Sequence, residues 1–320
     1  YDSNIAIGTN ALGGSHTGTA SVQNVAIGGD AMGGAMNDAD NNVAVGFAAM
    51  QALTLGDGNV VIGAYAGQDN TEGGQNICIG HGTMDAADTA TARDQNVAIG
   101  QNALGGQTAA VSHCVAIGHN ALILQNADVK NTAIGGLAGA ELVGGNYNTL
   151  VGYNAGNQLS ASESGNTFIG HDAGSNADGA GYNTFIGGFA GGLGVVVGNS
   201  NICVGYAAGY DLTDGPGNVL IGRDAGANMT TGDYNVAIGL NAADGLVGDA
   251  NNNIAIGNAS LGGCTAATSS NIAIGTSTLA HASYAAANIN IAIGQDSGAA
   301  ITSGSSNVLI GHEAGSTITD

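Results

Sequence analysis

A short apolar motif recurs along the whole chain at nearly constant spacing. Each copy reads Asn, then Val, Ile or Thr, then a small or apolar residue, then Ile or Val, and finally Gly, as in residues 24–28. The closing glycines lie 17 to 20 residues apart and mark eighteen copies. They are Gly8, Gly28, Gly46, Gly63, Gly80, Gly100, Gly118, Gly135, Gly152, Gly170, Gly187, Gly205, Gly222, Gly239, Gly257, Gly275, Gly294 and Gly311.

This spacing predicts a stack of short strands. β-Branched residues two apart lie on one face of a strand, and the glycine after them ends it. The segments between motifs are rich in Gly, Asn, Asp, Ser and Thr, which form turns. A unit of this length cannot bury a core alone, whereas stacked units bury a continuous one. We therefore predict an all-β fold, a parallel β-solenoid of about eighteen coils of 17–20 residues, in one continuous domain over residues 1–320.

The asparagine that opens the motif has a predicted structural role. It is present in seventeen copies, and Cys114 replaces it in the other. Buried asparagines stacked in successive coils can form a hydrogen-bonded ladder; alternatively, each Asn simply accommodates a left-handed backbone before its strand. The predicted ladder residues are Asn4, Asn24, Asn42, Asn59, Asn76, Asn96, Asn131, Asn148, Asn166, Asn183, Asn201, Asn218, Asn235, Asn253, Asn271, Asn290 and Asn307.

The middle strand position makes the predicted strand apolar on both faces, because it is Ala in ten copies and Val, Cys, Leu or Phe in the others. One face would fill the core of the coil, and a continuous apolar stripe on the other is rare on the surface of a monomer. We predict that the middle residues form a chain–chain interface; the alternative is a flat coil whose interior holds both faces. The predicted interface residues are Ala6, Ala26, Leu150, Phe168, Phe185, Leu220 and Leu309.

Composition and charge restrict the function. The chain has 58 glycines, one proline and 44% apolar residues, which argues against both disorder and collagen. Its net charge is −21 with only three basic residues, so nucleic acid and anionic membrane surfaces are not expected partners. No run of about 18 apolar residues is present, so membrane insertion is not expected either.

Candidate catalytic chemistry is sparse. Four histidines directly follow a closing glycine, a position that we interpret as exposed and polar. The cysteines are interpreted as small, mostly buried apolar residues that are too far apart for disulfides. These residues are His81, His119, His171, His312, Cys78, Cys114, Cys203 and Cys264. We predict no enzyme activity and no cofactor, although the oxygen-rich loop at residues 38–42 could hold calcium.

The repeats resemble those of known surface proteins. Asn-x-Ala-Ile-Gly is similar to the repeats in the heads of trimeric autotransporter adhesins, and residues 166–174 and 183–187 resemble repeats of bacteriophage tail fibres and related surface fibres. The adhesin resemblance implies a left-handed parallel β-roll with three chains side by side. Both resemblances imply an extracellular location on a cell surface or virion.

We therefore predict a non-catalytic structural or adhesive fibre segment whose loops contact a receptor or glycan. The partner would be the chain itself, as a homotrimer or, alternatively, as a self-assembling filament stacked head to tail, because joining residue 320 to residue 1 preserves the repeat spacing. Two further alternatives are an ice-binding solenoid, suggested by the threonines at positions 132, 149, 167 and 184, and a solenoid polysaccharide lyase.

Overall fold

The computed structural model describes residues 3–15, 18, 20–85, 93–106, 111–126, 130–160, 163–192, 194–263, 268–280 and 288–318. The chain divides into two compact units, Tyr1–Ser162 and Glu163–Asp320. All the regular secondary structure among the described residues is β-strand, and each strand is three residues long.

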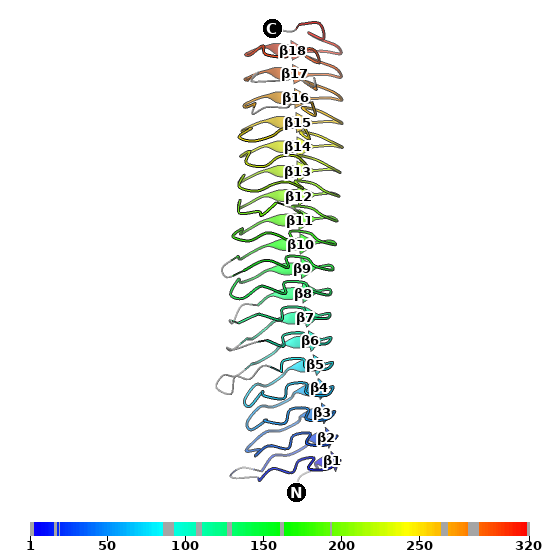
Figure 1. The fold of residues 1–320 in the computed structure, drawn as a ribbon, viewed down its shortest axis with the longest axis vertical. Helices are drawn as coiled ribbons and strands as arrows, with labels where there is room; N and C mark the ends of the chain where they lie inside the picture. The colour runs from blue at the N-terminus through cyan, green and yellow to red at the C-terminus, as the bar shows by residue number, and fades with distance from the viewer. Residues whose placement is uncertain are drawn as a thin grey trace. The chain divides into compact units, whose positions relative to one another are not determined.

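The described residues of the first unit form nine strands that pair in sequence order. They are β1 (Ile5–Ile7), β2 (Val25–Ile27), β3 (Val43–Val45), β4 (Val60–Ile62), β5 (Ile77–Ile79), β6 (Val97–Ile99), β7 (Val115–Ile117), β8 (Thr132–Ile134) and β9 (Thr149–Val151). Neighbouring strands are parallel, and equivalent motif positions face each other throughout, as Ala26 faces Ala44. The unit is a parallel β-solenoid with one strand in each coil (Figure 1).

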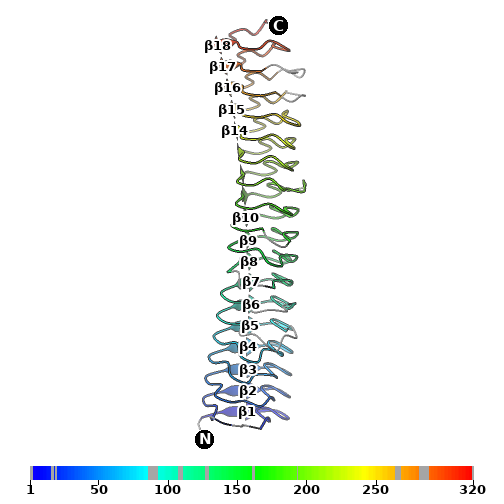
Figure 2. The same ribbon diagram turned by 90° about the vertical axis from the view of Figure 1, so that its left-hand side faces the viewer.

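The second unit repeats this arrangement. Its strands are β10 (Thr167–Ile169), β11 (Thr184–Ile186), β12 (Ile202–Val204), β13 (Val219–Ile221), β14 (Val236–Ile238), β15 (Ile254–Ile256), β16 (Ile272–Ile274), β17 (Ile291–Ile293) and β18 (Val308–Ile310). They are also parallel and in register, so that Phe168 faces Phe185. Figure 2 shows the strands of each unit along one side of its coils and the linking segments on the other. The all-β parallel solenoid expected from the repeat is confirmed, while its left-handed winding and its single continuous domain stay predictions.

The closing glycine is required by the close approach of successive coils. Gly28 has a φ of 134°, a conformation that side chains rarely adopt. A Cβ at this position would also collide with the carbonyl oxygen of Gly46 in the next coil. The same φ region and the same backbone contact recur at most of the closing glycines, which explains why the motif always ends in Gly.

In most coils, two positions of complementary size fill the interior. The middle strand residue and the residue six positions later both point into the core, as Ala26 and Met32 do, and both are fully buried. Where the middle residue is large, the later one is glycine. A Cβ on Gly174 would lie 2.5 Å from the Phe168 ring, and Gly191 stands in the same relation to Phe185. The volume of the core therefore stays filled while the residue types change.

Candidate functional site

The asparagines that open the motif are joined in a hydrogen-bonded ladder. In the first unit, the backbone N–H of Asn42 donates to Asn24 Oδ1 at 2.8 Å, and Asn42 Nδ2 donates to the Gly56 carbonyl at 2.8 Å. Asn59 continues the series by donating its backbone N–H to Asn42 Oδ1 at 2.9 Å. The Asn42 side chain thus links its coil to the next and also fixes the linking segment that leads there.

The second unit has the same ladder. The backbone N–H of Asn218 donates to Asn201 Oδ1 at 2.8 Å, and Asn218 Oδ1 in turn accepts the backbone N–H of Asn235 at 2.8 Å. Asn218 Nδ2 donates to the Gly232 carbonyl at 2.8 Å. Fifteen of the seventeen predicted asparagines are fully buried; Asn4 and Asn307, in the first and last coils, are more exposed.

Cys114 occupies the ladder position in the coil of β7. Its backbone N–H donates to Asn96 Oδ1 at 3.0 Å, so the coil is held from one side, but its thiol provides no amide for the next coil. In the next coil, Asn131 Nδ2 donates a hydrogen bond of 2.7 Å to the side-chain oxygen of the buried Gln125. A glutamine from the linking segment therefore supplies part of the missing polar contact.

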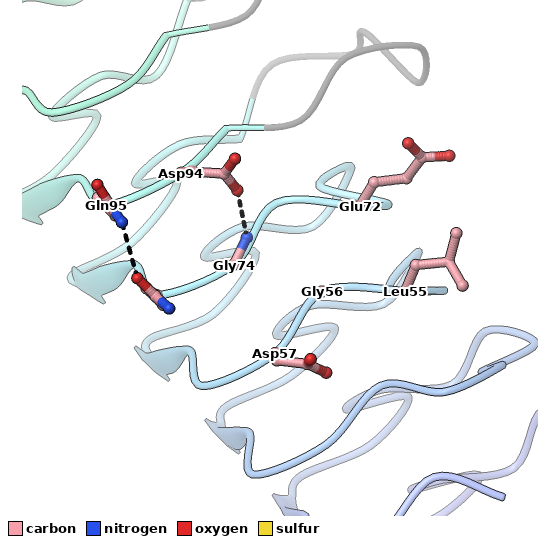
Figure 3. Close-up of a pocket in the computed structure, with 8 residues that line it drawn as sticks. Leu55, Gly56, Asp57, Glu72, Gly74, Asp94 and Gln95 are labelled. Atoms are coloured by element: carbon pink, nitrogen blue, oxygen red, sulfur yellow. Dashed lines mark hydrogen bonds between the residues drawn. The ribbon is translucent and has the colours of Figure 1, made fainter. Parts of the chain in front are cut away.

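A second ladder, which the sequence reasoning missed, runs nearer the surface. The backbone N–H groups of Val22 and Asp40 donate to the carboxylates of Asp40 and Asp57, both at 2.7 Å. Figure 3 shows the next bond of this kind, from the Gly74 N–H to Asp94 Oδ1 at 2.8 Å.

The residues of this outer ladder share one motif position, two residues before the ladder asparagine. The acceptors of the described bonds are Asp40, Asp57, Asp94, Ser112, Asn199, Asn251, Ser269, Asn288 and Ser305. Most copies carry Asp, Asn or Ser there, and this recurrence was the sequence signal that could have revealed the ladder.

The acidic residues near the outer ladder form no evident metal site. Asp57, Glu72 and Asp94 line a shallow hollow of about 290 Å³ in the first unit (Figure 3), but Asp57 and Asp94 already accept backbone hydrogen bonds. In the loop considered for calcium, Asp40 is likewise bonded to the Val22 N–H. Within the described ranges, no three His, Cys, Asp or Glu side chains gather so as to hold a metal ion.

The middle strand residues were predicted to face another chain, but in the structure they face the interior of their own coil. Among the residues predicted to form a chain–chain interface, Ala26, Leu150, Phe168, Phe185 and Leu220 are fully buried inside their own coils. Leu309 is partly buried and Ala6 is exposed, because each lies in a terminal coil of the described chain.

The apolar surface comes instead from the first and third strand positions. Ile62 is 39% exposed and Ile79 is 37% exposed, and the equivalent side chains of the other strands are partly exposed or exposed. This outward strand face, the first and third residues of each strand, consists only of Val, Ile and Thr.

The described thiols are buried, whereas the histidines that follow closing glycines are exposed. Burial raises the pKa of Cys78 to about 12, with an opposing contribution from Arg93, and burial also raises the pKa of Cys203, so both thiols hold their protons at neutral pH. Cys114 is buried too, and Cys264 lies outside the described residues. The histidines that follow closing glycines are exposed, namely His81, His119, His171 and His312.

The pKa of one carboxyl group, that of Asp85, is strongly raised. Burial and the nearby carboxylate of Asp69 raise the pKa of Asp85 to about 6, and His81 partly opposes this shift. Asp85 Oδ1 is buried without a hydrogen-bond partner. This group can therefore change its charge within a physiological pH range.

No helix that could span a membrane occurs in the part of the chain that the structure describes. Comparison with models of known protein families and with curated proteins found no match to this chain.

Proposed function

We propose that this protein is a non-catalytic structural and adhesive fibre segment, exposed on a cell surface or virion, whose chains associate through the outward strand face. The observation that carries the proposal is the composition of this face. Every side chain on it is Val, Ile or Thr, and none is charged, although the chain as a whole has a net charge of −21.

The geometry of this face supports contact with another chain. The side chains stand in register from strand to strand, because Ile62 faces Ile79 and the same pairing repeats through each unit. Monomeric proteins rarely expose continuous apolar patches larger than a few hundred Å². Burying the face against other copies of the chain removes it from water without placing charged strand residues in the interface.

The repeat resemblance favours two further copies of the chain as the partner, in a parallel homotrimer. The linking segments then remain on the outside, where they are free to contact a receptor or a glycan. Both ladders consist of local hydrogen bonds between successive coils, so a chain of this kind can be long and regular without a large globular core.

The test introduces charge on the face and measures mass in solution. We expect a threefold mass for the native protein by light scattering, and a monomeric mass for the double variant Ile62→Glu, Ile79→Glu. Leu124→Glu is the matched control, because Leu124 is a similarly exposed apolar residue on a turn, at 45%; this variant should keep the native mass.

Folding must be separated from association in this experiment. Two glutamates facing each other across adjacent strands repel, so the double variant Ile62→Thr, Ile79→Thr is made as well. Threonine already occupies the first position of the outward face in β8 and β9, and it is β-branched like the isoleucine that it replaces, so this variant should keep the strand spectrum in circular dichroism and associate more weakly. A native protein that is monomeric at micromolar concentration would refute the proposal, and long filaments in electron micrographs would favour head-to-tail stacking instead of a trimer.

A further inference from the structure

A cluster of aromatic side chains lies on the surface of the second unit. The rings of His171 and Phe189 are 5.2 Å apart between centroids, and those of Phe189 and Tyr206 are 5.8 Å apart at an interplanar angle of 80°. The Phe189 ring also meets the Tyr210 ring edge to face at 6.3 Å. Three successive coils thus place aromatic rings side by side, since each coil adds one or two at neighbouring positions.

Three of these rings border a shallow hollow. Phe189, Tyr206 and Tyr210 line an open depression of about 280 Å³, together with the small side chains of Ala207 and Ala227. Because those two positions are alanines, the space between the rings is not filled by the protein itself. Pockets for drug-sized ligands are roughly 300–1,000 Å³, so this hollow suits a ligand with a single ring.

A pair of opposite charges stands beside the aromatic surface. Asp224 completes the lining of the hollow, and its Oδ2 accepts a hydrogen bond of 3.0 Å from Arg223 Nε. The Arg223 side chain is 70% exposed and that of Asp224 is 26% exposed, so the pair can reach a ligand in the hollow. A hydrogen-bond acceptor and a multiple donor therefore lie next to ring faces.

We propose that this hollow binds one hexopyranose residue. One face of a pyranose carries C–H groups that pack against aromatic rings, and its hydroxyl groups both donate and accept hydrogen bonds. The carboxylate of Asp224 and the guanidinium of Arg223 match those hydroxyls. An anionic ligand would meet the Asp224 carboxylate and a strongly acidic protein, and a cationic ligand would meet Arg223, so a neutral sugar fits this arrangement best.

The inference rests on the proposed adhesive function, because it assigns a ligand class to that role, but none of the residues that line the hollow belongs to the outward strand face. We would record saturation-transfer NMR spectra of the native protein with the methyl glycosides of glucose, galactose and mannose. We expect transfer to the ring C–H protons of at least one of them. Tyrosine emission provides an independent titration signal, because the chain contains no tryptophan.

Substitutions in the hollow identify the site. Tyr206→Ala removes one wall and should weaken binding of the responding glycoside about tenfold. Asp224→Asn keeps the shape but weakens the acceptor, so a smaller loss is expected. Tyr153→Ala is the matched control, because Tyr153 also follows a closing glycine directly and is 54% exposed, against 55% for Tyr206. This variant should bind as the native protein does.

Three outcomes would overturn the inference. They are an absence of saturation transfer with all three glycosides, unchanged binding by Tyr206→Ala, and displacement of the sugar by choline chloride, which would mark the hollow as a cage for quaternary ammonium ions. Repeating the titration with the double variant Ile62→Thr, Ile79→Thr separates the two proposals. Sugar binding that survives loss of association leaves this site standing, and association without sugar binding leaves the fibre proposal standing.

Discussion

The ladder of motif asparagines, called here the inner ladder, and the outer ladder both link successive coils, but they contain different side chains. The inner position is Asn in every copy except that of Cys114. The outer position is Asp, Asn or Ser in most copies, but other residues also occur there, among them Gly74 and the only proline, Pro216. The two ladders also run in opposite senses, because Asn42 donates its N–H back to Asn24, whereas Asp40 donates its N–H forward to Asp57.

Burial explains this difference in selectivity. The inner amide is removed from water, so both its oxygen and its nitrogen need partners, and Asn provides an acceptor and a donor in one short side chain. The outer side chain only has to accept, and water can replace it where it is missing. Pro216 lacks an N–H and cannot donate to the outer ladder, yet it is tolerated because this position is partly exposed.

The strongest test of this comparison is to put a charge into the inner ladder. Asn218 Nδ2 faces the carbonyl oxygens of Gly232 and Gly215 and the side-chain oxygen of Asn201. In Asn218→Asp, a carboxylate oxygen would meet these acceptors in a fully buried site, and we expect a loss of about 3–5 kcal/mol in the free energy of unfolding. Urea unfolding at pH 7 measures it, and an unchanged midpoint would contradict the role assigned to burial.

The same principle predicts a gain where the inner ladder is interrupted. Cys114→Asn restores an amide in the coil of β7, and we expect stabilisation by about 1 kcal/mol, one net hydrogen bond. Cys114→Ala serves as the control and should not stabilise. If Cys114→Asn is less stable than the native protein in thermal unfolding, then the Gln125 contact already fulfils this function and leaves no room for the amide.

Asp85 is an intermediate case, since its carboxyl group is about half buried. Its pKa in the folded protein, about 6, lies above the ordinary value of 3.8, so the fold favours the protonated form. The stability that this group contributes is therefore full below pH 4 and is lost as the pH rises through 6. We expect a loss of less than about 1 kcal/mol because solvent screens the site. The free energy of unfolding of Asp85→Asn, measured between pH 4 and pH 8, should lack this pH-dependent loss. A variant with the same pH profile as the native protein would contradict the assignment to Asp85.

The smallest effect is expected in the outer ladder. Asp57→Asn keeps an oxygen for the Asp40 N–H and removes one negative charge near Glu72 and Asp94. The free energy of unfolding should change by no more than about 0.5 kcal/mol. A loss comparable to that of Asn218→Asp, measured in the same urea series, would mean that the outer ladder is as selective as the inner one.

Sequence periodicity located every strand but did not distinguish its two faces. Positions 25 to 27 are Val, Ala and Ile, which are apolar on both sides, so the period of two cannot show which side is buried. The size relation between Phe168 and Gly174, or between Ala26 and Met32, could have identified the inner face, because only residues that share a core must compensate in volume.

The candidate ligand site was less accessible to sequence reasoning. Phe189 and Tyr206 are 17 residues apart and occupy positions that differ by one relative to their closing glycines. Their contact depends on how consecutive turns place neighbouring side chains, and the hollow depends on the small residues Ala207 and Ala227 beside them. No local motif marks such a combination.

The sequence by itself determined the repeat and the place of each strand, because these follow from residue preferences that recur at a fixed spacing, and it left open whether the recurring asparagines form a ladder. Only the tertiary structure decided which strand face is buried, how the outer ladder links the coils, and which aromatic rings meet. These features depend on packing within a coil and on contacts between successive coils, where packing volume and access to water outweigh local backbone preference.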